Sequence, residues 1–121
     1  MRRPERLAES LKEQIAEVVG FELDDPRLLD VTVTDVDVAP DLRDAKVYVL
    51  VRGDKVEIDK ALTALKHATP FVRQQVASGL EMHHVPHLHF VRDTAGENAE
   101  RVGEILSKLD IKSDLEVRDE G

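Results

Sequence analysis

All five histidines of the chain lie within one short segment, at His67, His83, His84, His87 and His89. Histidine can bind a transition metal, and it can also contact RNA bases. His87 and His89 are two residues apart, so they share a face if this segment is a strand. Imidazoles at this spacing could hold zinc or nickel, but neither a cysteine nor a neighbouring carboxylate completes the set of ligands. We therefore expect no metal site and no cofactor.

The cations of the same segment favour RNA as the partner. Between residues 60 and 92 the chain carries Lys60, Lys66, Arg73 and Arg92 but only one acid, Glu81. The whole chain has a net charge of −8, which argues weakly against a phosphate-rich partner. The positive charge is therefore local. The alternative is that these charges cluster by chance and only solvate a surface.

Catalytic chemistry has little support in the sequence. The chain has no cysteine, no glycine-rich phosphate loop, and no serine in the setting of a nucleophile elbow. Its many carboxylates fall mostly on the polar faces of expected helices, where water surrounds them. We expect a non-enzymatic protein. No apolar run approaches the roughly 18 residues of a membrane span, and no signal peptide is visible, so we expect a cytoplasmic protein with no membrane partner.

The first half of the chain reads as a helix followed by a hairpin. Leu7, Leu11, Ile15 and Val18 recur at helical spacing, which predicts a helix over residues 4–20 that ends at Gly20. Residues 31–39 and 45–52 alternate as strands and are joined by a short polar turn, which favours an antiparallel hairpin. The apolar parity of the first strand switches between Val33 and Val36, which indicates a bulge or two partly covered faces.

The second half places the basic segment on two helices and a strand. A helix over residues 55–68 should stop at Thr69-Pro70, because a proline ring clashes with the carbonyl four residues back. Thr69 would then cap a second helix, and this helix start would offer the amides of Phe71 and Val72 to a phosphate. A third strand follows over residues 86–92. A last helix, capped by Asp93 or Thr94, runs to about residue 109.

This order, α-β-β-α-α-β with an extra C-terminal helix, predicts an α+β fold. The amphipathic patterns favour a three-stranded sheet with helices packed on one face and an aliphatic core. We expect one domain over residues 1–110 and a polar, mobile tail over residues 111–121.

The chain with its helix–kink–helix resembles the type II KH domain, and more specifically the ribosome-binding factor A (RbfA) family. The resemblance covers about residues 3–109. It rests on the order and spacing of several stretches: Arg3-Pro4-Glu5-Arg6-Leu7, Asp25-Pro26-Arg27-Leu28, residues 31–38, Asp41-Leu42, residues 45–49, Phe71-Val72-Arg73, and Pro86-His87-Leu88-His89-Phe90 with Asp93. The family has a kink of the form Ala-x-Gly in place of the KH glycine-rich loop. Here Ala68-Thr69-Pro70 occupies that place, so the alanine matches and the glycine does not.

The resemblance implies a non-enzymatic factor that binds the free small (30S) ribosomal subunit and the 5′-terminal helix region of its 16S rRNA. Such a factor assists late rRNA processing and matters most in the cold. It also implies a cytoplasmic protein, a monomer by default, that can meet assembly GTPases. The candidate RNA-binding residues are Arg3, Arg6, Arg27, Lys60, Lys66, His67, Ala68, Thr69, Pro70, Arg73, His87, His89 and Arg92.

A protein-binding adaptor is the alternative function. In that hypothesis an acidic surface contacts a basic ribosomal protein or an assembly GTPase, and RNA contact is incidental. Glu97, Glu100 and Glu104 are the acids that we expect to carry it.

Overall fold

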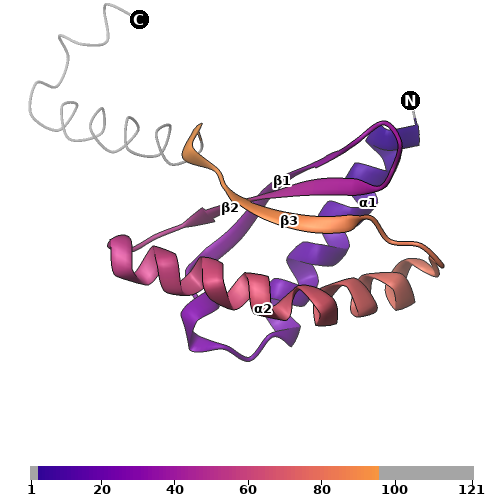
Figure 1. Cartoon of the computed structure of the whole chain (residues 1–121). Helices are drawn as coiled ribbons and strands as arrows, with labels where there is room; N and C mark the ends of the chain where they lie inside the picture. Colours follow the sequence, from indigo (N-terminus) through magenta and orange to yellow (C-terminus); the bar gives the residue numbers. More distant parts are fainter. Residues whose placement is uncertain (1–2, 96–121) are drawn as a thin grey trace, which may run out of the picture.

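The structure, a computed structural model, describes residues 3–95 and has the order helix, two strands, long helix, strand (Figure 1). The elements are α1 (Arg3–Glu17), a π turn (Val18–Glu22), a 3-10 turn (Pro26–Leu28), β1 (Val31–Val38), β2 (Asp44–Val51), α2 (Lys55–Leu80) and β3 (His87–Arg92). The α+β class is thereby confirmed. The C-terminal helix and the tail that the sequence predicts, with Glu97, Glu100 and Glu104, lie outside the described residues.

The three strands form one mixed sheet in the order β1-β2-β3. β1 and β2 pair antiparallel, which confirms the hairpin, and β3 lies parallel to β2 at the edge. The register of β1 shifts between Val33 and Asp35. This irregularity confirms the bulge, because it lets both Val33 and Val36 point into the core.

Both helices pack on one face of the sheet, as Figure 1 shows. The core between the layers is aliphatic, and Ile15, Val47, Val49, Leu65 and Val72 are fully inaccessible to solvent. No polar or charged side chain is buried among the described residues. The opposite face of the sheet combines exposed polar residues such as Asp37 and Lys46 with the half-buried Tyr48 and Leu50. Among residues 3–95 the two helices cover one face only, as predicted.

The first helix does not end at Gly20 as the sequence predicts. After α1 the chain continues through the π turn to Glu22, and the amide of Leu23 donates to the carbonyl of Val18 at 3.0 Å. A π turn is wider than an α turn. It allows the two adjacent residues Val18 and Val19 to be buried together, at 1% and 4% exposed.

The predicted break at Thr69-Pro70 is wrong, because α2 is one helix of 26 residues with Pro70 inside it. Thr69 does not cap a new helix, since its hydroxyl donates to the carbonyl of Leu65 at 2.9 Å. The proline removes one helical hydrogen bond. Burial of Leu65 before it and of Val72 after it favours continuing the helix across the sheet. The amides of Phe71 and Val72 therefore lie in a helix interior and are not phosphate donors.

The two ends of α2 are well capped. Asp54 and Glu57 form a capping box at the start, with the Glu57 amide 2.8 Å from Asp54 Oδ1 and the Asp54 amide 3.0 Å from Glu57 Oε1. At the other end Glu81 adopts a left-handed conformation with a φ of 53°.

Among the described residues, no helix combines the length and the apolar character that a membrane crossing requires.

Candidate nucleic-acid interface

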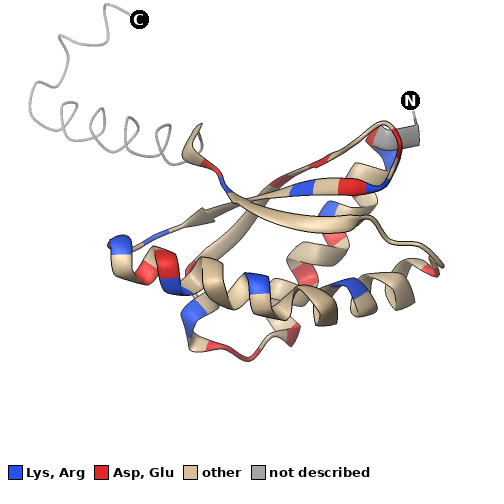
Figure 2. Ribbon diagram, in the orientation of Figure 1, with Lys and Arg blue, Asp and Glu red and all other residues tan. Residues whose placement is uncertain are grey.

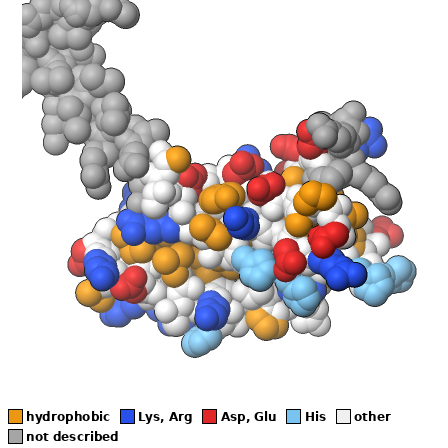
Figure 3. Space-filling view, turned by 45° about the horizontal axis from the view of Figure 1, so that its top comes forward, with side chains coloured by type: hydrophobic (Ala, Val, Ile, Leu, Met, Phe, Trp, Pro, Cys, Tyr) orange, Lys and Arg blue, Asp and Glu red, His pale blue; other side chains and the backbone are white. Residues whose placement is uncertain are grey.

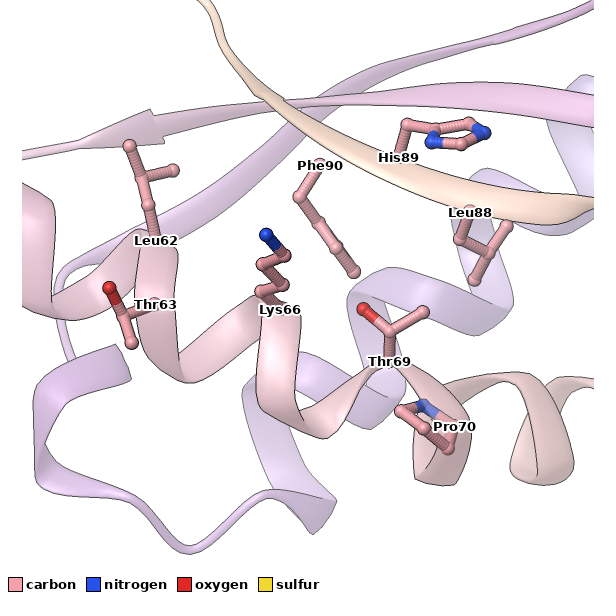
Figure 4. Close-up of a pocket in the computed structure, with 8 residues that line it drawn as sticks. All are labelled: Leu62, Thr63, Lys66, Thr69, Pro70, Leu88, His89 and Phe90. Atoms are coloured by element: carbon pink, nitrogen blue, oxygen red, sulfur yellow. The ribbon is translucent and has the colours of Figure 1, made fainter.

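A groove runs between the middle of α2 and the edge strand β3, and we call it the α2–β3 groove. Its volume is about 570 Å³. It is lined by Leu62, Thr63, Lys66, Thr69, Pro70, Leu88, His89 and Phe90 (Figure 4). The groove therefore uses one stripe of α2, at helical spacing, and consecutive residues of β3.

The groove combines an apolar surface with one cation. Leu88 is buried and Phe90 is half-buried, and both point toward α2 (Figure 4). Lys66 is exposed and extends from α2 into the space beside Phe90. An aromatic and aliphatic surface can stack a nucleobase, and an ammonium group at its side can bind the adjoining phosphate.

Pro70, which lines the groove, changes the hydrogen bonding of the α2 backbone at this place. Proline has no amide hydrogen, so the carbonyl of Lys66, four residues earlier, lacks its normal helical donor. Such a carbonyl can accept from a base amino group or a ribose hydroxyl.

His89 lies on the far side of β3 from the apolar residues (Figure 4), and strand alternation places His87 on the same side as His89. His89 Nε2 lies 2.8 Å from Asp44 Oδ1 on the neighbouring strand, and both side chains are more than half exposed. His87 lines a separate hollow of about 480 Å³ together with Arg43, His83 and His84. The face of the molecule shown in Figure 3 carries histidines and cations, with acidic side chains among them.

Arg73 has a structural contact that the sequence does not predict. Its Nη2 donates to the carbonyl of Val85 at 2.6 Å, and its Nε donates to the carbonyl of Pro86 at 3.1 Å. The guanidinium group thus fastens the connection between α2 and β3 to the helix. It lies at the hollow that His87 lines and outside the α2–β3 groove.

Lys60 and Arg27 lie together at a different place, in a hollow of about 260 Å³ near the start of α2. Arg27 is bound by Asp25, with Nε 3.0 Å from Oδ1 and Nη2 2.7 Å from Oδ2. This hydrogen-bonded contact lowers the pKa of Asp25 and raises the pKa of Arg27. Arg27 is therefore already paired with a carboxylate and is a poor candidate for a phosphate.

The remaining candidates do not join the groove. Arg6 is exposed on α1, and Arg3 starts the same helix, which does not line the groove. His67 is exposed on α2, whereas Ala68 packs against the core. Arg92 is exposed at the end of β3. Of the predicted residues the structure therefore brings the side chains of Lys66, Thr69 and Pro70 together at the groove. His89 belongs to the same stretch of β3, but its side chain points away from the groove toward Asp44.

Four groove residues were not predicted: Leu62, Thr63, Leu88 and Phe90. The signal for them is present in the sequence. Leu62, Lys66 and Pro70 are spaced four apart on one helix, and Leu88 and Phe90 are two apart on one strand. Only the pairing of α2 with β3 shows that these two patterns face each other.

Among residues 3–95, no group of three or more histidine or carboxylate side chains could hold a metal ion.

The family model described as ribosome-binding factor A matches residues 3–106. A ribosome-binding factor A of Solibacter usitatus is 41% identical over 107 residues, which cover 88% of this chain and 87% of the relative. The chain belongs to the ribosome-binding factor A family. The resemblance inferred from the sequence is thereby confirmed. Because the family consists of ribosome-binding factors, membership also agrees with the expected non-enzymatic role.

Solved structures of the RbfA family share this fold. The crystal structure of ribosome-binding factor A from Thermus thermophilus matches with a TM-score of 0.67 and 30% identity, covering 75% of this chain and 97% of the other. A homology model of Thermus thermophilus RbfA, fitted into the cryo-EM map of a 30S–RbfA complex, matches with a TM-score of 0.61 and 32% identity. It covers 72% of this chain and 91% of the other.

Proposed function

We propose that this protein is a non-enzymatic maturation factor that binds the free 30S subunit and contacts 16S rRNA through the α2–β3 groove. The observation that carries the proposal is that the exposed Lys66 and the half-buried Phe90 line the same groove. Family membership supports the target, because the Thermus thermophilus relative is described in a complex with the 30S subunit.

The groove is suited to single-stranded RNA. A base lies against Phe90 and Leu88, and the adjoining phosphate lies against the ammonium group of Lys66. The hydroxyl of Thr63 and the carbonyl of Lys66 contribute polar contacts that a ribose hydroxyl satisfies. Because the groove has one cation, Lys66, we expect electrostatic attraction to contribute modestly to RNA affinity and stacking to contribute much of it.

The resemblance to the family refines this proposal. The rRNA region is the 5′-terminal helix of 16S rRNA, and the step that the factor assists is late processing, with the greatest need in the cold. The work takes place in the cytoplasm, where subunits are assembled. Contact with an assembly GTPase and a monomeric state remain predictions from the same resemblance.

Co-sedimentation with purified subunits tests the proposal. The wild-type protein should sediment with free 30S subunits and much less with complete ribosomes. Lys66→Ala should weaken 30S binding about three- to tenfold, because a phosphate contact is lost. Lys60→Ala is the matched control, since it removes the same charge from the same helix outside the groove. Equal binding to both particles, or equal loss in the two variants, would contradict the proposal.

A further inference from the structure

The two most exposed large apolar side chains among the described residues lie in one segment, residues 17–30, which runs from the last residue of α1 to the residue before β1. Phe21 is 86% exposed and Leu29 is 81% exposed. Single exposed apolar residues are common on protein surfaces. Two large apolar side chains that are almost fully exposed in one short segment make that segment a candidate docking surface.

The backbone of the 17–30 segment is held in place from inside. Val18, Val19 and Leu28 are buried, and the amide of Leu28 donates to the carbonyl of Asp25 at 2.9 Å. Farther along, the amide of Arg52 donates to the carbonyl of Asp30 at 3.3 Å. The segment therefore presents Phe21 and Leu29 outward on an anchored backbone.

The charge of this segment determines which partner fits. Residues 17–30 contain five acids (Glu17, Glu22, Asp24, Asp25 and Asp30) and one cation. That cation, Arg27, is already bound to Asp25 at 2.7 Å. Figure 2 shows acids along this connection, and Figure 1 shows the connection on the opposite side of α2 from β3. The segment itself therefore has a net charge of −4, and the cations Arg52 and Lys60 adjoin only its end near Arg27 and Asp30. A partner bound at its acidic part leaves the α2–β3 groove open.

We propose that the 17–30 segment docks a basic protein segment of the 30S subunit, in which lysine or arginine side chains flank apolar residues. Phe21 and Leu29 supply apolar anchors, and Glu22, Asp24 and Asp30 supply the opposite charge. Proteins that bind rRNA are rich in lysine and arginine, which matches this charge. The assignment of the partner to the 30S subunit rests on the proposed function.

Site-specific photo-crosslinking tests the docking surface. Phe21 is replaced by p-benzoylphenylalanine, which keeps an aromatic side chain at the position. The probe protein is irradiated in two arms, one with intact 30S subunits and one with the RNA-free mixture of proteins extracted from 30S subunits. The attached molecule is identified by mass spectrometry. We expect the same basic 30S protein in both arms.

A charge-reversed variant and a matched control sharpen the test. Glu22→Lys with Asp24→Lys in the probe protein should lower the crosslink yield at least about fivefold, because it reverses the complementary charge. Glu9→Lys with Glu13→Lys makes the same charge change on exposed residues of α1 and should leave the yield unchanged. Melting curves should be equal for the two variants, since all four acids are exposed.

The outcomes separate this proposal from the proposed function. A crosslink to rRNA, a crosslink to a second copy of this chain, or no crosslink to a 30S protein in either arm would overturn the docking proposal. Loss of co-sedimentation with 30S subunits would instead overturn the proposed function. The RNA-free arm then still decides whether the 17–30 segment binds a basic protein.

Discussion

The α2–β3 groove and the 17–30 segment lie on opposite sides of α2 and differ in both charge and shape (Figure 1). The groove is a concave surface in which Lys66 stands beside a half-buried aromatic ring. The segment is acidic and carries Phe21 and Leu29 almost fully exposed. A single net charge of −8 describes neither surface. The difference teaches that one helix can keep the anionic segment of an acidic chain apart from the groove that carries Lys66.

Arg73 is the residue whose removal should have the largest effect on the groove side. We expect Arg73→Ala to lower the free energy of unfolding by about 1–3 kcal/mol, because the carbonyls of Val85 and Pro86 lose a charged donor. Urea unfolding measures this change. Arg43→Ala, an exposed cation at the same hollow, is the control and should change stability by less than about 0.5 kcal/mol. Equal stability of the two variants would show that Arg73 is a surface charge only.

For the substitution Pro70→Ala we expect the stability of the fold and the RNA affinity of the groove to change in opposite directions. Pro70→Ala restores an amide that can donate to the Lys66 carbonyl, so we expect the helix to gain about 1 kcal/mol of stability. The same change gives the Lys66 carbonyl a helical donor, so if RNA donates to that carbonyl the change should weaken RNA binding. Thermal melting and RNA titration measure the two effects.

Gln74→Ala, on the exposed surface of the same helix, is the control for the Pro70 variant. It should leave RNA affinity unchanged. A less stable Pro70→Ala protein would mean that packing of α2 on the sheet requires the proline, and unchanged RNA affinity would remove the Lys66 carbonyl from the interface.

The smallest effect that we expect is that of Asp25→Asn, in the 17–30 segment, on the pH dependence of stability. The hydrogen bonds of Asp25 with Arg27 lower its pKa from the ordinary value of 3.8, so the folded state favours the charged carboxylate. The stabilisation is therefore complete above the unfolded-state pKa and is lost as pH falls through the folded-state pKa. We expect Asp25→Asn to make the acid-induced loss of stability below about pH 4 shallower.

Denaturant unfolding across this acidic range measures the Asp25 effect, with Asp24→Asn as a neighbouring control. A pH profile for Asp25→Asn that is identical to the wild-type profile would show that the contact with Arg27 does not hold the segment in solution.

The strands were predictable because the alternation of apolar and polar residues that specifies them is a local feature of the sequence. Alternation located β1 and β2 to within one residue at each end, and the parity switch after Val33 located the bulge. The helix boundaries were less predictable, because burial outweighed local preferences. Pro70 and Gly20 both favour a stop, yet buried Val72 and Val19 favour continuation.

The candidate site was predictable only in part, for a related reason. The basic segment identified Lys66, which lines the groove, whereas the side chain of His89, identified in the same way, points away from it. The apolar half of the groove depends on the pairing of α2 with β3 across the fold. Arg73 is likewise held by carbonyls more than ten residues away. Local charge identifies cations, but it does not show which of them are already bound to the protein itself.

The most direct test of the account is the salt dependence of binding to a single-stranded fragment from the 5′-terminal helix region of 16S rRNA. Affinity is titrated against salt for the wild type, for Lys66→Ala, and for Glu22→Lys with Asp24→Lys. If Lys66 neutralises one phosphate and the 17–30 segment lies outside the RNA interface, Lys66→Ala should flatten the slope of log affinity against log salt by about 0.7. The charge-reversed variant should keep the wild-type slope. A Lys66→Ala slope equal to the wild type, or a steeper slope on reversing the acids, would contradict the separation of the two surfaces.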